Sequence, residues 1–167
     1  MPNPQIVSFD VDGYDMITAA LMELVNTFPG LDAGEEFLFA TEPAEEGFAI
    51  FPTTGSFIYE ERESITGHVM QMCQYPFTTV YRKSGLNSSR RMTAKEWLDT
   101  FARWIELQPV IIDNEEYKLD DWPKLTGSRE IREVTRQAPA YLATVNDDKS
   151  ENWIMDVVIR YRNEFDR

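Results

Sequence analysis

The sequence has little of the chemistry on which most metal sites and disulfide scaffolds depend. Its 167 residues include one cysteine and one histidine. A single cysteine excludes an intrachain disulfide and a paired-cysteine site, and a single histidine excludes metal sites that need two or more histidine ligands. No apolar run approaches the roughly 18–20 residues that span a bilayer. The opening residues lack both the basic and the apolar regions of a signal peptide. We therefore expect no membrane association and no signal peptide.

Basic residues are also scarce. Sixteen Lys and Arg stand against 29 Asp and Glu, which gives a net charge of −13. Contacts to nucleic-acid phosphates need an excess of Lys and Arg, so this balance argues against a nucleic-acid-binding protein. The charge is unevenly distributed, because residues 1–66 hold 13 acids and one base, whereas residues 82–95 hold five bases and no acid. The chain therefore has one acidic and one basic segment.

The length and the apolar patterns predict one α+β domain over residues 1–167, with residues 1–13 as an N-terminal arm. Apolar residues at helical spacing predict amphipathic helices over residues 14–28 and 93–107. Thr93 and Glu96 match a capping box at the start of the second helix. We expect a mainly antiparallel sheet with both helices packed on one face.

Short apolar or alternating runs predict the strands of this sheet. They cover residues 36–40, 47–51, 57–61, 68–82, 129–136, 141–144 and 153–162. Residues 41–46 form an acidic turn between the first two strands, and residues 110–119 are expected to be irregular and extended. Pro76 cannot donate a ladder hydrogen bond, so it predicts a bulge or an edge position in its strand.

The segment from Val7 to Gly13 carries the most suggestive catalytic pattern. It resembles the opening motif of haloacid-dehalogenase-type phosphatases, in which the first Asp attacks phosphorus and the second serves as acid or base beside magnesium. Asp10 and Asp12 stand at those positions, but Tyr14 replaces the expected Thr or Ser. A magnesium-dependent phosphatase that uses Asp10 and Asp12 is therefore an alternative, and an arm leading into a helix is the favoured interpretation.

Other candidate sites are weaker. His68 and Cys73 differ in parity along their predicted strand, so their side chains point to opposite faces and do not form a catalytic pair. Adjacent acids such as Glu45 and Glu46 lack the alternating spacing of a calcium loop. The aromatic helix around Trp97 fits core packing, and a ligand pocket there is a third possibility. We expect no catalytic residues, no metal and no cofactor.

The basic segment suggests a contact between copies of the chain. Arg82, Lys83, Arg90 and Arg91 lie in or beside a predicted loop over residues 83–91. A solvated loop is the plain interpretation. The alternative is that these bases meet the acidic residues 1–66 of a neighbouring copy, in a head-to-tail contact that closes into a ring.

The order of these elements resembles a family. It is similar to the minor capsid or tail-completion proteins of phages and prophages of Gram-positive bacteria, in particular siphophage tail terminators. The matching pieces are residues 26–31, 47–50, 74–82, 96–98, 104–106, 132–135, 140–142 and 153–161. The resemblance rests on their order and spacing, and it does not include the segment around Asp10.

The resemblance implies a structural protein and not an enzyme. Such a subunit forms a ring, commonly a hexamer, at the end of the tail tube, and its partners are its own copies, the tail-tube protein and the head–tail connector. The expected location is the tail or neck of the virion, with assembly in the cytoplasm of the bacterial host. Neither sequence-specific nucleic-acid binding nor membrane binding is expected.

Overall fold

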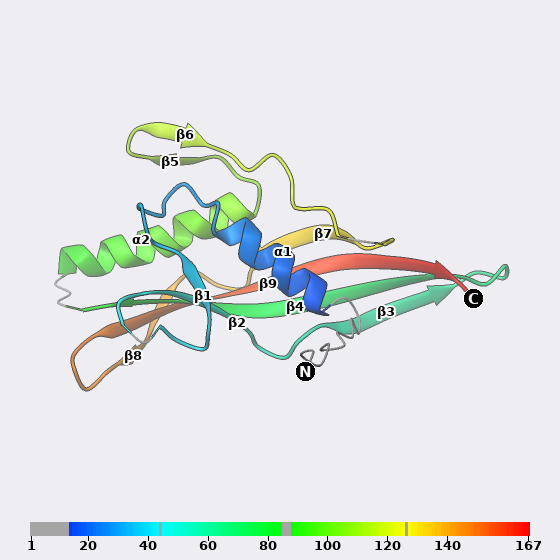
Figure 1. Ribbon diagram of the computed structural model, residues 1–167, viewed down its shortest axis with the longest axis horizontal. Coiled ribbons are helices and arrows are strands. Elements are labelled where there is room, and N and C mark those ends of the chain that lie inside the picture. Colours follow the sequence, from blue (N-terminus) through cyan, green and yellow to red (C-terminus); the bar gives the residue numbers. More distant parts are fainter. Residues whose placement is uncertain (1–13, 44, 85–87, 126) are drawn as a thin grey trace, which may run out of the picture.

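The computed structural model describes residues 14–43, 45–84, 88–125 and 127–167, which form two helices and nine strands (Figure 1). In chain order the elements are α1 (Tyr14–Val25), β1 (Phe37–Phe39), β2 (Gly47–Pro52), β3 (Phe57–Glu63), β4 (His68–Lys83), α2 (Ser88–Ile105), β5 (Val110–Ile112), β6 (Glu115–Tyr117), β7 (Glu130–Arg136), β8 (Tyr141–Val145) and β9 (Glu151–Asp166). The protein is therefore α+β, as the sequence predicts. The predicted N-terminal arm lies outside the described residues.

Two long antiparallel strands form the centre of the sheet. β4 and β9 pair in constant register over 16 residues, from His68 opposite Asp166 to Lys83 opposite Glu151. The outer side of β4 pairs first with β3 and then with β2, whereas the outer side of β9 pairs with β7 and then with β8. Figure 1 shows this ladder running the length of the molecule, with the ends of β3, β4 and β9 extending beyond the helices.

The first two strands correct a sequence expectation. Their positions agree with the prediction, but β1 and β2 run parallel and not as a hairpin. The chain must therefore cross back between Phe39 and Gly47, and the described residues of this acidic crossing are 41–43, 45 and 46. The start of β1 is held by a side chain, because the Phe37 N–H donates to the Asn26 carboxamide oxygen at 2.7 Å.

Pro76 occupies neither a bulge nor an edge. It lies in the middle of β4, opposite Val158 of β9, and the register continues through it. Its carbonyl accepts from the Thr53 N–H at 2.9 Å, on the side where β2 ends and β3 has not yet begun. In a strand the N and O of one residue point to the same side. The missing N–H of Pro76 therefore faces this gap, and the ladder to β9 loses no hydrogen bond.

Both helices contribute to one core with the central strands. The core includes Leu21 of α1, Phe101 of α2 and Tyr75 of β4. The Thr18 and Tyr75 hydroxyls hydrogen-bond at 3.0 Å, which joins α1 to β4. Trp97 of α2 stacks on Phe48, with ring centroids 4.2 Å apart. The partner of Phe48 on β4 is Tyr81, which lies on the same face of β4 as Tyr75.

The helix boundaries differ from the prediction. α1 ends at Val25 because the Asn26 and Thr27 side chains donate to the carbonyls of Met22 and Leu24, so the last turn does not continue. α2 begins at Ser88, five residues before the expected start.

The early start of α2 makes the predicted capping box wrong. Thr93 and Glu96 both lie inside the helix. The predicted loop over residues 83–91 is correspondingly shorter, because residues 88–91 belong to α2.

Residues 110–119 contain a hairpin that the sequence analysis missed. β5 and β6 pair antiparallel, and Asp113 and Asn114 connect them with φ angles of 49° and 66°. Two successive left-handed residues are typical of a type I′ turn, for which Asp and Asn are favoured. The Asp-Asn pair was therefore the signal in the sequence.

Candidate functional site

The predicted basic contact residues lie next to an acidic segment of their own chain. Arg82 donates to the Pro43 carbonyl at 2.7 Å, to the Asn152 carboxamide oxygen at 2.9 Å and to a Glu42 carboxylate oxygen at 3.1 Å. Its side chain is 14% exposed. Each of the three guanidinium nitrogens donates one hydrogen bond to an acceptor of the same chain, so Arg82 ties residues 42 and 43 to β4 and β9.

The other predicted contact residues are arranged differently. The Lys83 ammonium lies 5.7 Å from the centroid of the Tyr81 ring, within the range of a cation–π contact. Arg90 and Arg91 lie within the first turns of α2, and their side chains fall outside the described part of the chain. Arg82 and Lys83 are thus successive residues at the end of β4, and their side chains point to opposite faces of the strand.

The acidic crossing makes one more contact with the basic segment. Both the backbone N–H and the hydroxyl of Ser84 donate to the Glu46 carboxylate. Opposite charges in the two segments therefore meet within one copy. This explains part of the uneven charge distribution without a neighbouring copy.

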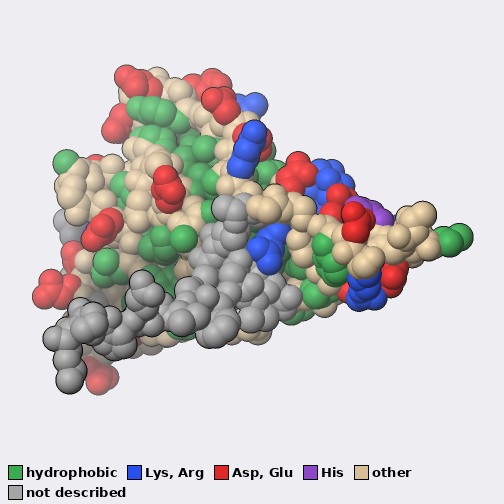
Figure 2. All heavy atoms as spheres, turned by 45° about the vertical axis from the view of Figure 1, so that its right-hand side comes forward, with side chains coloured by type: hydrophobic (Ala, Val, Ile, Leu, Met, Phe, Trp, Pro, Cys, Tyr) green, Lys and Arg blue, Asp and Glu red, His purple; other side chains and the backbone are tan. Residues whose placement is uncertain are grey.

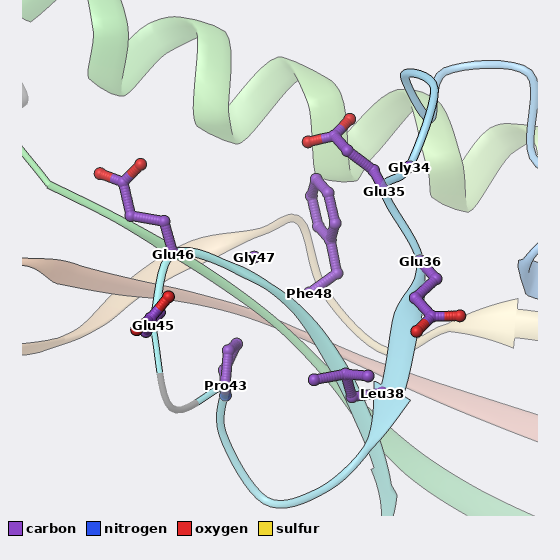
Figure 3. A pocket seen from close by; sticks show the side chains of 9 residues that line it. All are labelled: Gly34, Glu35, Glu36, Leu38, Pro43, Glu45, Glu46, Gly47 and Phe48. Atoms are coloured by element: carbon purple, nitrogen blue, oxygen red, sulfur yellow. The ribbon is translucent and has the colours of Figure 1, made fainter.

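A notch of about 420 Å³ opens beside this crossing (Figure 3). Its walls include Glu35 and Glu36, which precede β1, and Glu45 and Glu46, which precede β2. Figure 3 shows the Glu35 and Glu46 side chains extending toward α2, with Leu38 on the opposite side. One of the Glu35 oxygens accepts from the Asp32 N–H at 2.8 Å, so this carboxylate stabilises the turn before β1.

The face of the molecule in Figure 2 carries many Asp and Glu side chains along its broad side, while Lys and Arg are more frequent from the middle toward the narrow end. Basic residues also lie at the broad end, where β4 ends with Arg82 and Lys83. Near the narrow end, basic and acidic side chains alternate as ion pairs, such as Arg160 with Glu133 at 2.7 Å and Arg167 with Glu63 at 2.7 Å. At the broad end Arg82 forms a corresponding ion pair with Glu42 at 3.1 Å.

Two apolar patches lie on opposite edges of the sheet at this broad end. The β1 patch consists of Leu38 and Phe39, both 45% exposed, and Phe51, 37% exposed. The rings of Phe39 and Phe51 are in contact, with centroids 5.1 Å apart. Exposed apolar side chains that cluster in this way indicate an interaction surface, whereas single ones do not.

The β8 patch lies on the other edge. It consists of Tyr141, Leu142 and Val145, with exposed fractions of 45%, 40% and 59%. All five residues of β8 are exposed and none is charged. An uncharged, exposed edge strand is a surface that natural proteins usually cover or protect. The sequence analysis predicted both strands but not their edge positions, because strand order depends on pairing between distant segments.

The candidate catalytic and metal residues that the structure describes do not converge. Asp10 and Asp12 lie outside the described residues. His68 and Cys73 point to opposite faces of β4, as predicted: His68 is exposed beside Asp166 at 2.8 Å, and Cys73 is buried in the core. Among the described residues, no group of three His, Cys, Asp or Glu side chains is placed to bind a metal ion.

Among the described carboxylates, Glu106 and Asp148 have shifted pKa values. Burial raises the pKa of Glu106 above its ordinary range, against the opposing effect of the nearby Arg136 guanidinium. Hydrogen bonds from the Ser150 hydroxyl and N–H lower the pKa of Asp148. Glu106 follows the end of α2 and Asp148 lies in the β8–β9 turn, so each has a local structural partner and the two do not form a common site.

Comparison with known proteins adds no relative. No protein-family model matches the chain, and no curated protein sequence matches it. Among the described helices, none is both long and apolar enough to cross a membrane.

Proposed function

We propose that this protein is a structural subunit of phage tail completion, a tail terminator or head–tail joining protein. In this proposal its copies form a ring, hexameric by the family resemblance, at the end of the tail tube. The observation that carries the proposal is the pair of unlike apolar patches on opposite edges of one sheet. Two unlike patches on opposite sides of a subunit give head-to-tail contacts, and such contacts generate rings when the rotation closes.

The fold also supports the proposal over a phosphatase. Haloacid-dehalogenase-type phosphatases need a parallel sheet that carries the two Asp at the end of a strand. Among the described strands, the pairs are antiparallel except for β1 with β2. No observation therefore favours the alternative that uses Asp10 and Asp12.

The proposed ring has two kinds of partner besides its own copies. One face meets the last ring of the tail-tube protein, and the other meets the head–tail connector. The subunit is then found at the neck of the virion, and it assembles in the cytoplasm of the bacterial host. The subunit needs neither a cofactor nor a membrane for this role.

Deletion of the gene from the phage or prophage that encodes the chain tests the proposal. After induction, electron microscopy of the lysate is expected to show filled heads and separate tails, because heads and tails have no joining ring. Expression of the wild-type gene from a plasmid should restore complete virions. Complete virions in the uncomplemented deletion strain, at the wild-type number, would overturn the proposal.

A further inference from the structure

We propose that neighbouring copies join sheet edge to sheet edge, with β8 of one copy antiparallel beside β1 of the next copy. The sheet would then continue from subunit to subunit. This inference rests on the proposed function for the statement that copies assemble in a ring. The contact itself is inferred from the described fold: from the side chains that β1 and β8 expose and from the directions of these two edge strands.

A single row of side chains runs from one edge to the other. Leu38 of β1 pairs with Ala49 of β2, which pairs with Val80 of β4, then with Ile154 of β9 and finally with Tyr141 of β8. Paired residues lie on the same face, so the row is apolar across all five strands. Ala49 and Val80 are buried in its interior, whereas Leu38 and Tyr141 at its ends are each 45% exposed. The two exposed ends are at the same level of the sheet, so a second copy placed beside the first continues the row.

The strand directions fit the same arrangement. β8 is antiparallel to β9, β9 to β4 and β4 to β2, while β2 is parallel to β1. β8 and β1 therefore run in opposite directions at the two edges. A neighbouring copy related by rotation about an axis along the strands presents β1 antiparallel to β8, which is the pairing of most of this sheet.

The remaining edge strands are poor candidates. β3 begins with three exposed apolar residues, Phe57, Ile58 and Tyr59, but its second half carries Glu60, Glu61 and Glu63. β7 carries Glu130 and Glu133. If the copies are not shifted along the strands, β3 of one copy would face β7 of the next. Glu60 and Glu130 would then lie close together, because Glu130 pairs with Arg162 and Glu60 pairs with the β4 residue that is opposite Arg162. Register shifts occur in β3, β7 and β8 alike, so the acidic side chains, and not the bulges, distinguish β3 and β7 from β8.

The backbone at the β1 edge is only partly open. The Ala40 N–H donates to the Ile50 carbonyl, so the backbone groups of Leu38 also face β2 and those of Phe37 and Phe39 face outward. The Phe37 N–H is already bonded to Asn26. The contact therefore uses the backbone of Phe39 and the side chains of the β1 patch, and most of its stabilisation is apolar burial.

Charged residues at one end of β8 and β1 set the register in which the two strands pair. The turn after β8 contains Lys149, and it lies at the same end of the sheet as Glu36 and Glu45 of the notch. Edge pairing brings this ammonium toward the acidic notch of the next copy. Asp147 and Asp148 share the turn, so we assign the ion pair to register and not to affinity.

Engineered cysteines test the contact directly, because the natural Cys73 is buried and does not interfere. Residues directly opposite each other on paired antiparallel strands have Cα atoms about 4.5–5.5 Å apart, which suits a disulfide. We expect Leu38→Cys mixed with Tyr141→Cys to give covalent dimers under mild copper-phenanthroline oxidation. The double variant should give a ladder of larger species on a non-reducing gel.

Three controls test whether the crosslink is specific for Leu38 and Tyr141. Wild type and each single variant alone should remain monomeric on the gel, and so should Tyr141→Cys mixed with Phe57→Cys on β3, a residue of similar exposure. Circular dichroism shows whether each variant is folded. Dimers from Tyr141→Cys alone would overturn the inference, because they indicate a symmetric β8–β8 contact.

The remaining results separate this inference from the proposed function. If wild-type rings are seen by light scattering or electron microscopy but Leu38→Cys and Tyr141→Cys do not crosslink, the edge contact is refuted and the ring remains. If no association occurs at any concentration or on purified tails, the ring itself is refuted. Efficient crosslinking with a ladder that ends at one closed size supports both.

Discussion

Asp99 is the residue whose removal tests most directly how the β8 patch is held in place. One of its carboxylate oxygens accepts from the Ala140 N–H at 2.9 Å and lies 3.5 Å from the Arg136 guanidinium. The other accepts from the Lys95 ammonium at 2.7 Å. Ala140 directly precedes β8 and is buried, and the Asp99 side chain is 20% exposed. Asp99 therefore ties α2 to the entry of the β8 edge strand.

The cost of Asp99→Ala can be estimated from these contacts. A buried N–H that loses its charged acceptor costs about 1–3 kcal/mol, because no water replaces the bond. The two ion pairs are partly exposed and add roughly 0.2–1 kcal/mol each. We expect the free energy of unfolding to fall by about 2–3 kcal/mol, on the basis of these values. For a domain of this size the melting temperature should fall by roughly 4–12 °C.

Urea unfolding followed by tryptophan fluorescence measures this change. Asp99→Asn retains an acceptor oxygen for Ala140, so it should cost clearly less than Asp99→Ala. Glu96→Ala, at an exposed position of the same helix, should change the free energy by no more than about 0.5 kcal/mol. A loss below about 0.5 kcal/mol for Asp99→Ala would refute the reasoning. The Leu38–Tyr141 crosslink should also weaken in Asp99→Ala, at temperatures where the variant is still folded.

Three further changes test other parts of the structure. Arg82→Ala should destabilise the protein by about 1–3 kcal/mol in urea unfolding, and Arg82→Lys should recover only part of this loss because an ammonium cannot reach three acceptors in one plane. Phe101→Ala should cost about 3–5 kcal/mol in the same assay, since its ring is fully buried against Phe28. Burial raises the pKa of Glu106 in the folded state, so its contribution to the free energy of unfolding of the wild type should fall as pH rises through that pKa. Glu106→Gln cannot titrate and should remove this part of the pH dependence, so its stability relative to wild type should increase from about pH 4 to about pH 7; an unchanged difference would contradict the shift.

The long strands could be predicted because their residues alternate. On β4 the buried residues run from Val69 to Thr79 at every second position, and β9 alternates in the same way from Trp153 to Tyr161. A strand with one face in a core must alternate, so the period is visible without knowledge of the partner strand. The alternation within each strand was therefore enough to predict the two long strands of the central ladder and the fold class.

The start of α2 and the parallel pairing of β1 with β2 were not predicted, because neither produces a periodic pattern of apolar residues. The first turns of α2 consist of Ser88, Ser89, Arg90 and Arg91, which add no residue to an apolar stripe, so the predicted start fell at the first apolar period. Parallel pairing of β1 with β2 leaves no pattern in either strand. It depends on how the chain returns after Phe39, and a propensity for extended structure does not determine direction.

The predicted contact site illustrates the same limit. The bases were recognised correctly as an island in an acidic chain, but Arg82 is clamped by the acidic crossing of its own copy. Separation along the sequence does not give separation in space, because the pairing of β2 with β4 brings Glu42 and Glu46 beside residues 82–84. The apolar patches of the proposed contact are recognisable only from exposed fractions, and the role of Lys83, Arg90 and Arg91 in a contact between copies stays a prediction.

The negative charge still governs how such a surface can work. Two copies that each carry −13 repel one another over a Debye length of roughly 8–10 Å at moderate salt, so approach is opposed before contact is made. Burial of apolar surface, at about 25 cal/mol per Å², acts only once the patches touch. In the proposed ring, a tail tube that binds one copy raises the local concentration of the next binding event, and this intramolecular advantage offsets the repulsion. In this proposal, the subunit is monomeric when free and forms a ring on the tail. The acidic residues prevent premature association, and the β1 and β8 patches stabilise the final contact.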